Sequence, residues 1–128
     1  MRLLLDTHAL LWSFSGVKKL SQKAWDAVGD NANDIYVSAA SAWEIATKFR
    51  IGKLPQAEPF VYTFEESLRK MSFKELAVTV GHAQRAGLLA GVHKDPFDRI
   101  LIAQAQAENL LLVSNEKLFD GFGVQRLW

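Results

Sequence analysis

Two short runs of purely aliphatic residues, one near each end of the chain, restrict the fold more than any other feature of this sequence. Residues 3–5 are three consecutive leucines, and residues 110–113 are three leucines followed by a valine. Runs this short and this uniformly apolar are typical of β-strands that are buried on both faces, as in parallel sheets covered by helices. We therefore predict that both runs lie inside a sheet with helices on either side.

The remaining segments alternate between strand-like and helix-like patterns. Further strands are predicted at residues 35–38, 75–80 and 124–127, and helices at 9–14, 22–28, 41–49, 60–71, 82–89 and 96–109. Parallel strands need crossover connections, which helices supply, so this alternation predicts an α/β fold: an α/β/α sandwich with a mainly parallel central sheet. The sequence shows no internal repeat or domain boundary, and residues 1–128 are expected to form one domain.

The composition excludes several classes of function. The 128 residues are 49% hydrophobic, which is enough for a real core. The 15 basic and 14 acidic side chains give no strong overall charge toward nucleic acid or membrane, so any basic surface must be local. The absence of cysteine excludes disulfides, zinc–thiolate sites and cysteine nucleophiles. No segment resembles a signal peptide or approaches the ~20 apolar residues of a membrane span, which predicts a cytoplasmic protein with no membrane partner.

Acidic side chains follow the predicted strands or open the helices after them. Asp6 comes directly after the first strand, and Glu44 lies in the first turn of the helix after the second. Asp95 and Asp98 stand at the start of the long helix, and Glu116 follows the last long aliphatic run. Because the carboxyl ends of parallel strands meet at one edge of a sheet, we expect all five carboxylates to lie there.

Such a cluster favours a cation. Like charges gathered in one crevice raise each other's pKa unless a cation joins them. Oxygen ligands with water in the remaining positions suit Mg²⁺ or Mn²⁺. A site of this kind polarises a phosphoryl oxygen, generates a hydroxide and aligns the two for in-line displacement at phosphorus. The acids therefore favour a metal-dependent phosphodiesterase.

Each acid also has a purely structural interpretation. Ser41 and Glu44 have the spacing of a capping box, in which the Glu44 side chain would reach back to the Ser41 amide. Glu44 and Lys48 form an i,i+4 pair, which is most often a contact on a solvated helix face. Taken alone, neither pattern requires a function for Glu44.

The other acids can be interpreted in the same way, with one exception. Asp95 precedes a proline and can simply cap the helix, and Asp98 can be balanced by the adjacent Arg99. Glu116 in a polar turn can be ordinary surface. Asp6 is the hardest to explain structurally, since a carboxylate straight after a buried strand needs a partner. The coincidence of all five at one edge of the sheet is what favours a site.

The remaining polar and aromatic residues give weaker signals. The histidines show no metal-ligand spacing and are interpreted as surface or core side chains, His93 also as a contact to RNA or to metal ligands. Thr7 and Ser114 flank acids and are interpreted as donors to carboxylates or water. A basic rim for phosphates is available from Lys48, Arg50, Lys53, Lys94 and Arg99. The tryptophans at apolar helix positions are Trp12, Trp25 and Trp43. We expect them in the core or at an interface rather than as platforms for base stacking.

Four segments together give the chain a resemblance to PIN-domain proteins, close to the VapC-type toxins of bacterial toxin–antitoxin pairs. They are LDTHALLW at residues 5–12, SAASAWEIATKFRIGKL at 38–54, HKDPFDRILIAQA at 93–105 and LVSNEKLFDGFGV at 112–124. The first and third together are specific, and the resemblance covers nearly the full length. It implies a Mg²⁺- or Mn²⁺-dependent endoribonuclease with a parallel sheet and a carboxylate-lined pocket.

The resemblance also implies roles for individual acids. The metal-binding acids of the family match Asp6, Glu44 and Asp98, and Asp95 is an additional acid of the DPFDR subgroup. The fourth family position, usually an aspartate, is Glu116 here, and this longer side chain is assigned an outer role that acts through water. The five acids together form the expected catalytic set.

The same resemblance implies partners. Toxins of this family cleave structured RNA, often tRNA, and a small cognate antitoxin wraps the toxin and blocks its pocket. Family members commonly form homodimers, which reach operator DNA through the antitoxin. Apolar helix surface around Trp12, Trp25 and residues 60–64 is expected to contact such a partner.

Two other functions are compatible with parts of the sequence. One is a receiver-like α/β domain that is phosphorylated on an aspartate, which fits the length and the acid at the end of a strand. The other is a catalytically silent module that keeps the PIN-like fold and only binds a partner. Mass gain from a small phosphodonor would identify the first, and failure to bind Mn²⁺ would favour the second.

Overall fold

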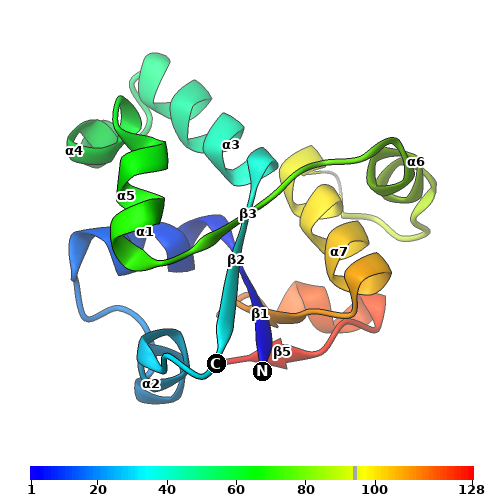
Figure 1. The fold of residues 1–128 in the computed structure, drawn as a ribbon. Coiled ribbons are helices and arrows are strands. Elements are labelled where there is room, and N and C mark those ends of the chain that lie inside the picture. Colours follow the sequence, from blue (N-terminus) through cyan, green and yellow to red (C-terminus); the bar gives the residue numbers. More distant parts are fainter. Residues whose placement is uncertain (94) are drawn as a thin grey trace.

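The computed structural model describes residues 1–93 and 95–128, and its centre is a five-stranded sheet (Figure 1). The strands are β1 (Arg2–Leu5), β2 (Asp34–Ser38), β3 (Lys74–Leu76), β4 (Leu111–Val113) and β5 (Arg126–Leu127). Their order is β3-β2-β1-β4-β5, and each neighbouring pair is parallel. The predicted α/β/α sandwich is therefore confirmed, and the carboxyl ends of the strands share one edge.

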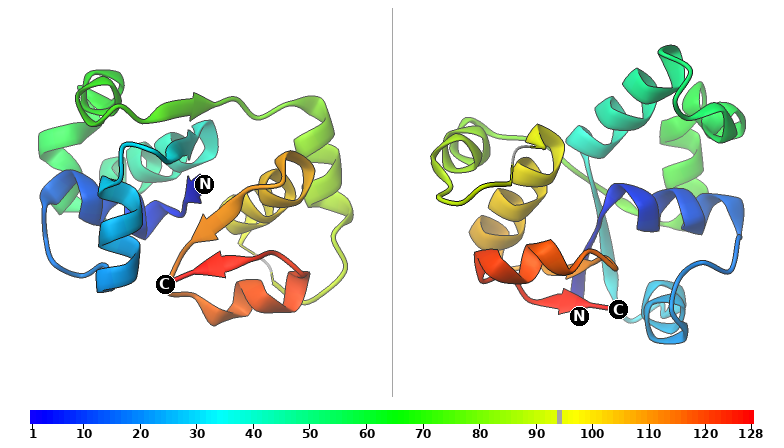
Figure 2. Two further views of the ribbon diagram at one scale, coloured as in Figure 1. Left: turned by 60° about the horizontal axis from the view of Figure 1, so that its bottom comes forward. Right: turned by 180° about the vertical axis from the view of Figure 1, so that it is seen from behind.

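Helices connect the strands and cover both faces of the sheet, as Figure 2 shows from two further sides. They are α1 (Thr7–Ser15), α2 (Gln22–Gly29), α3 (Ala39–Arg50), α4 (Glu58–Val61), α5 (Phe64–Met71), α6 (Val80–Leu88) and α7 (Pro96–Glu108), with 3₁₀ turns η1 (Pro55–Ala57) and η2 (Lys117–Phe122). The first three helices and α5 contribute to the apolar layer on one face. α7 and η2 form the layer on the other face, and α6 packs against α7.

The leucines of β1 alternate between the two apolar layers. Leu3 and Leu5 belong to the layer with α1, and Leu4 belongs to the layer with α7. All three are completely buried, as expected for a strand that is covered on both faces. Burial of each such side chain contributes about 1.5–3 kcal/mol. This central strand fixes the position of the residue that follows it, Asp6.

Several predicted elements differ in extent from the observed ones, and two of these differences have a clear local cause. The helix predicted at residues 60–71 is divided into α4 and α5, because the backbone leaves the helical conformation at Thr63 (φ −125°, ψ 36°). The strand predicted at 75–80 ends at Leu76, because Thr79 already begins α6. Its hydroxyl accepts a hydrogen bond from the His82 backbone N–H, and the His82 ring accepts one from the Thr79 N–H.

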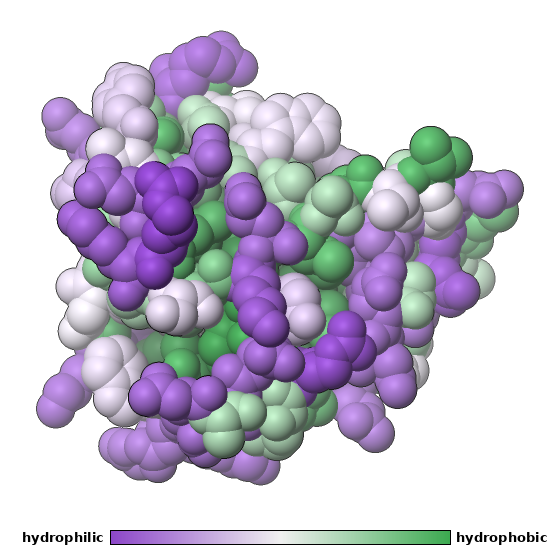
Figure 3. All heavy atoms as spheres, viewed as in Figure 1, coloured by the Kyte–Doolittle hydropathy of each residue, from purple (hydrophilic) through white to green (hydrophobic). Residues whose placement is uncertain are grey.

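Hydrophilic side chains cover most of the face seen in Figure 3, with smaller apolar areas between them. The large apolar side chains that are exposed come from several elements, among them Trp43, Tyr62 and Val80. No helix in the described part of the chain is long and apolar enough to cross a membrane.

Candidate active site

Five carboxylates converge on one small cavity at the carboxyl edge of the sheet. The cavity has a volume of about 100 Å³ and is lined by Asp6, Thr7, His8, Glu44, Lys48, Asp95, Asp98, Asn115, Glu116 and Phe119. It lies where β1 and β4 are neighbours and the strand order reverses, which is the usual ligand position in an open α/β sheet. A larger cavity of about 460 Å³ beside Phe64 and Leu68 is lined mainly by apolar surface. The structure thus brings all five predicted site residues together.

Asp6 is held by both the sheet and the first helix. Its backbone N–H donates to the Val113 carbonyl at 3.1 Å, which ties it to β4. Its side chain caps α1, since Oδ1 accepts from the Ala9 N–H at 2.7 Å. Burial raises the pKa of this carboxyl group, although hydrogen bonds from Ser114 and Ala9 oppose the rise. These neutral donors orient Asp6 without cancelling its charge.

Glu44 is a cavity residue and not part of a capping box. α3 begins at Ala39, and its N-cap is Ser38, whose hydroxyl accepts from the Ala40 N–H at 3.0 Å. The capping box predicted from Ser41 and Glu44 is therefore wrong, because both residues lie inside the helix. The Glu44 carboxylate does not cap the helix and lines the cavity instead.

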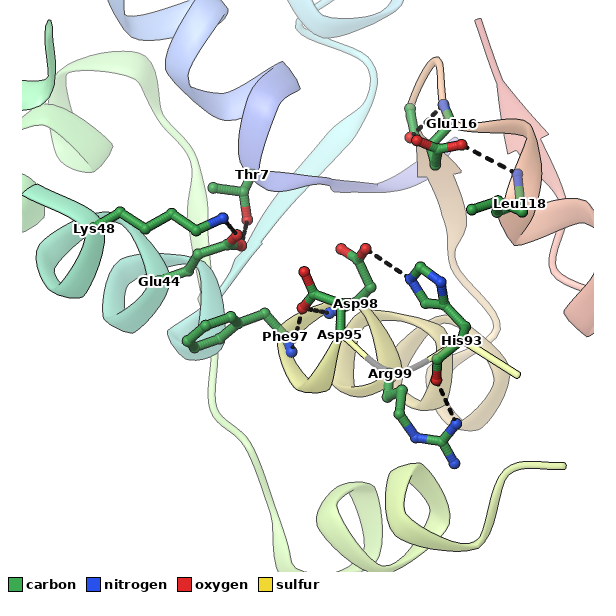
Figure 4. A network of polar contacts seen from close by, with 11 residues as sticks. Thr7, Glu44, Lys48, His93, Asp95, Phe97, Asp98, Arg99, Glu116 and Leu118 are labelled. Atoms are coloured by element: carbon green, nitrogen blue, oxygen red, sulfur yellow. Dashed lines mark hydrogen bonds and ion pairs between the residues drawn. The ribbon is translucent and has the colours of Figure 1, made fainter. Parts of the chain in front are cut away.

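Two side chains hold the Glu44 carboxylate in place, as Figure 4 shows. Thr7 Oγ1 donates to Oε1 at 2.6 Å, and Lys48 Nζ donates to Oε2 at 2.5 Å. The hydrogen bond from Lys48 to Glu44 raises the pKa of Lys48, and the charges of Asp95 and Asp98 add to the rise. The sequence alone suggested that Glu44 and Lys48 form a contact on a solvated helix face. In the structure this i,i+4 pair lies in the cavity instead. Lys48 thus brings an ammonium group into the acid cavity.

The start of α7 supplies two further carboxylates. Asp95 is the N-cap, and its Oδ1 accepts from the backbone N–H groups of Phe97 at 2.9 Å and Asp98 at 3.2 Å, which confirms the predicted cap. Asp98 Oδ2 lies 2.8 Å from His93 Nε2 (Figure 4). Burial raises the pKa of Asp98 to about 6, the charges of Asp95 and Glu44 add to the rise, and the His93 hydrogen bond opposes it.

Glu116 forms the wall on the β4 side. Its side chain caps η2 by accepting from the Leu118 N–H at 3.4 Å, and its own N–H donates to Ser114 Oγ at 2.9 Å. Figure 4 shows it across the site from Glu44, on the loop that follows β4. Glu116 is exposed, in contrast to the nearly fully buried Asp6 and Glu44.

The residues predicted to form a basic rim do not act as one group. Arg99 does not balance Asp98, because its guanidinium donates to the backbone carbonyls of Ala86, Leu89 and His93. Lys48 lies in the cavity, Arg50 and Lys53 are exposed at the far end of α3, and Lys94 lies outside the described residues. Among the described residues of the predicted rim, Lys48 is the one that lines the acid cavity.

Three lining residues were not predicted as part of the site. Asn115 stands between Ser114 and Glu116, so the rule that ligands bind beyond the carboxyl ends of strands would have found it. His8 follows Asp6 by two residues and could have been found in the same way. Phe119 reaches the cavity because η2 folds back over the sheet, and no local pattern in the sequence signals that.

The donor set fits a hard divalent cation. Its members are carboxylates, the oxygen ligands that Mg²⁺ and Mn²⁺ prefer. Burial is the main cause of the raised pKa values of Asp6 and Asp98, and the charge of Glu44 adds to both. Within residues 1–93 and 95–128, no three His, Cys, Asp or Glu side chains stand close enough to hold one ion. A cation would therefore be held by acids that turn inward or through bridging water.

The fold and the cavity define this protein as a parallel α/β domain with an acidic pocket at the switch point of its sheet. The chain belongs to the PIN domain family, whose sequence model matches residues 3–124. The resemblance predicted from the four motifs is thereby confirmed. The receiver-like alternative is wrong, because receivers of that type have the strand order 2-1-3-4-5 and this sheet has the order 3-2-1-4-5.

One relative in sequence is ribonuclease VapC16 from Mycobacterium tuberculosis. It is 44% identical over 55 residues, which are 43% of this chain and 39% of the relative's length. The match therefore spans well under half of that protein.

Solved structures with the same fold cover nearly the whole chain. VapBC2 from Rickettsia felis, bound to a DNA fragment from its promoter, has a TM-score of 0.68 at 16% identity and covers 98% of this chain and 97% of that one. FitAcB from Neisseria gonorrhoeae has a TM-score of 0.68 at 17% identity, covering 97% and 95%. VapC20 from Mycobacterium tuberculosis, described as a toxin that cleaves the sarcin–ricin loop, has a TM-score of 0.66 at 12% identity, covering 95% of each.

Proposed function

We propose that this chain is a divalent-metal-dependent endoribonuclease of the VapC type, the toxin of a toxin–antitoxin pair. The observation that carries the proposal is the convergence of five carboxylates on one cavity of a PIN domain. The relatives support it, because the similar sequence is named a ribonuclease and one similar structure is an RNA-cleaving toxin. The substrate is RNA, structured RNA such as tRNA included, so the proposed place of action is the cytoplasm.

The acids divide into inner and outer positions in this proposal. Asp6, Glu44 and Asp98 hold Mg²⁺ or Mn²⁺, directly or through water, with Asp95 beside them and Glu116 in an outer position. When bound, the cation polarises the scissile phosphoryl group and makes the attacking water more acidic. Burial raises the pKa of Asp98, the charges of Asp95 and Glu44 add to the rise, and a bound cation would offset this repulsion.

Neighbouring side chains prepare the acids for this task. Thr7 donates to one oxygen of Glu44 and fixes its orientation. His93 Nε2 lies 2.8 Å from Asp98 Oδ2, and this contact orients that carboxylate. Lys48 neutralises Glu44, and its partly exposed ammonium also offers a charge to a substrate phosphate.

The direct test is the substitution Asp6→Asn, with Asp26→Asn on the exposed surface of α2 as the control. We expect Asp6→Asn to abolish RNA cleavage in Mg²⁺ or Mn²⁺ and to weaken Mn²⁺ binding in calorimetry, with an unchanged circular dichroism spectrum. Asp26→Asn should match the parent in both assays. Cleavage by Asp6→Asn at the parent rate would refute the metal-site proposal. A parent protein that binds no Mn²⁺ and cleaves no RNA would favour the silent partner-binding module.

The proposed partners are a small antitoxin and a second copy of the chain. Support comes from the similar structure of VapBC2, which was solved on promoter DNA. We expect operator DNA to be contacted through the antitoxin, because the net charge of this chain is only +1. Expression should arrest growth only when Asp6 is intact, and co-expression of a small protein encoded immediately upstream should restore growth. Arrest by the Asp6→Asn variant would contradict the toxin role.

A further inference from the structure

An exposed tryptophan and a partly buried phenylalanine form an aromatic pair, and each directly precedes an acid of the cavity in the sequence. Trp43 on α3 is 65% exposed, although its position in the apolar pattern of the helix predicted a core or interface residue. Its ring meets that of Phe97 on α7, with centroids 5.0 Å apart and planes at 78°. Most of the Trp43 ring is therefore accessible to a ligand.

The two aromatic residues are next in sequence to two of the candidate catalytic acids. Trp43 directly precedes Glu44, and Phe97 directly precedes Asp98. The Phe97 backbone N–H donates to Asp95 Oδ1, so the backbone that carries this ring is bonded to a wall of the cavity. Figure 4 shows the Phe97 ring at the start of α7, on the side that faces α3 and Glu44.

We propose that Trp43, supported by Phe97, stacks an unpaired RNA base beside the acid cavity. This inference rests on the proposed function and adds the substrate class to it: RNA that presents at least one unstacked base next to the cleaved bond. Sequence-tolerant recognition of single-stranded RNA commonly uses aromatic rings in this way, because every base has a flat face.

The geometry of the pair suits stacking. In a T-shaped contact, Phe97 meets either one face or the edge of the Trp43 ring, so at least one face of Trp43 is left for a base. The contact also restrains the ring before RNA binds, which lowers the entropic cost of ordering it. Lys48, one helical turn after Glu44, stands close enough to the acids to contact the adjoining phosphate.

Binding of labelled RNA separates stacking from other effects. The measurements use the cleavage-deficient Asp6→Asn protein and two probes, a fluorescein-labelled single-stranded 12-mer and a fully paired duplex of the same length. Adding Trp43→Ala should weaken binding of the single strand at least about fivefold, the loss expected for one stacked base. Binding of the duplex should be unchanged, because its bases are already stacked on each other. Trp25→Ala, which removes a 41% exposed ring on α2, is the matched control and should bind both probes normally.

Two more variants test whether a flat ring is what matters. Trp43→Phe should keep most of the affinity for the single strand, and Trp43→Leu should lose it. Equal affinity of the Trp43→Phe and Trp43→Leu variants for the single strand would overturn the stacking site. No loss of affinity in Trp43→Ala would also overturn it. Either result would do so even if the substitutions at Trp43 changed the oligomeric state. Those outcomes leave the proposed nuclease intact provided that the parent cleaves RNA. Failure of the Asp6→Asn protein to bind either probe, together with a parent that does not cleave, would overturn both.

Discussion

His93 Nε2 lies 2.8 Å from Asp98 Oδ2, and the His93 ring packs edge-on against Phe119 and Phe122 with centroid distances of 6.2 Å. The two phenylalanines fix the plane of the imidazole, so its nitrogen is directed at the carboxylate. A loop residue is in this way bonded to the first turn of α7. His93 is therefore a positioning residue for Asp98.

Replacing His93 with phenylalanine should raise the pKa of Asp98 further. The new ring keeps the packing but cannot donate, and a hydrogen bond to a carboxylate favours its charged form. We expect a rise on the order of one pH unit in the metal-free protein. NMR titration of the Asp98 side-chain carbon measures it, with His93→Gln, which keeps a donor, shifting less. An unchanged titration in His93→Phe would show that the hydrogen bond does not act on Asp98.

The raised pKa of Asp98 should make metal-free stability depend on pH. Its pKa rises from 3.8 to about 6 on folding, so the folded state binds this proton more tightly than the unfolded chain. Stability from this group is complete below about pH 4 and is lost as the pH rises through about 6, at a cost on the order of 2 kcal/mol. Asp98→Asn should therefore stabilise the metal-free protein at pH 7.5 and leave it unchanged at pH 4.

Urea unfolding at the two pH values measures this effect, and Asp120 supplies a control of opposite sign. The hydrogen bond from Arg126 lowers the pKa of Asp120, so its stabilising contribution is present near neutral pH and lost in acid. Asp120→Asn should therefore cost stability at pH 7.5 and little at low pH. A loss of stability in Asp98→Asn at pH 7.5 would contradict the raised pKa.

Lys48→Met should tighten Mn²⁺ binding while weakening the metal-free fold. The ammonium shares Glu44 with any cation in the cavity, so its removal frees a ligand, and we expect at least a threefold lower Kd. Without metal, the buried Glu44 carboxylate loses its charged partner, which costs about 1–3 kcal/mol. Calorimetry and urea unfolding measure the two effects. Lys53→Met, on the exposed connector after α3, is the control, and weaker Mn²⁺ binding in Lys48→Met would contradict the competition.

Thr7→Val should disable the site without disrupting the fold. Valine has nearly the same shape, but Glu44 Oε1 loses a donor that lies 2.6 Å away in a buried position. Loss of such an orienting contact typically costs 10–100-fold in metal affinity or activity, so RNA cleavage should fall by about that factor. Thr7→Ser keeps the hydroxyl and should retain most of the rate. Equal rates in the two variants would show that the hydroxyl is not needed.

The overall fold could be predicted because its signals are local. Leu3, Leu4 and Leu5 indicate a doubly buried strand, and helix-like segments between the strands imply parallel crossovers. The same reasoning placed Asp6 and Glu116 at one edge, since a residue that follows a strand has little freedom. The ends of the shorter helices and strands were harder to predict. At the start of α6, for example, Thr79 and His82 form a cap in which a histidine ring replaces the usual acidic partner.

The details of the site depend on which elements cover which faces, and a single sequence does not contain that information in local form. Glu44 and Lys48 have the spacing of a surface pair, and only the packing of α3 against α1 and α7 turns that pair into the cavity. Trp43 has the periodicity of a core residue, yet it stays 65% exposed although Phe97 of α7 contacts its ring. Arg99 follows Asp98 directly but extends toward backbone carbonyls on the other side.

β1 is the middle strand of the sheet, and the Asp6 amide is hydrogen-bonded to β4. Such an amide is expected to exchange with deuterium only through unfolding of the whole domain, whereas the amides around Glu116, on a short exposed turn, exchange through local opening. On one side of the acid cavity, Asp6 is expected to open only when the whole domain unfolds. On the other side, the turn that carries Glu116 is expected to open far more often. We expect ligands to enter and leave past Glu116 while Asp6 stays in place.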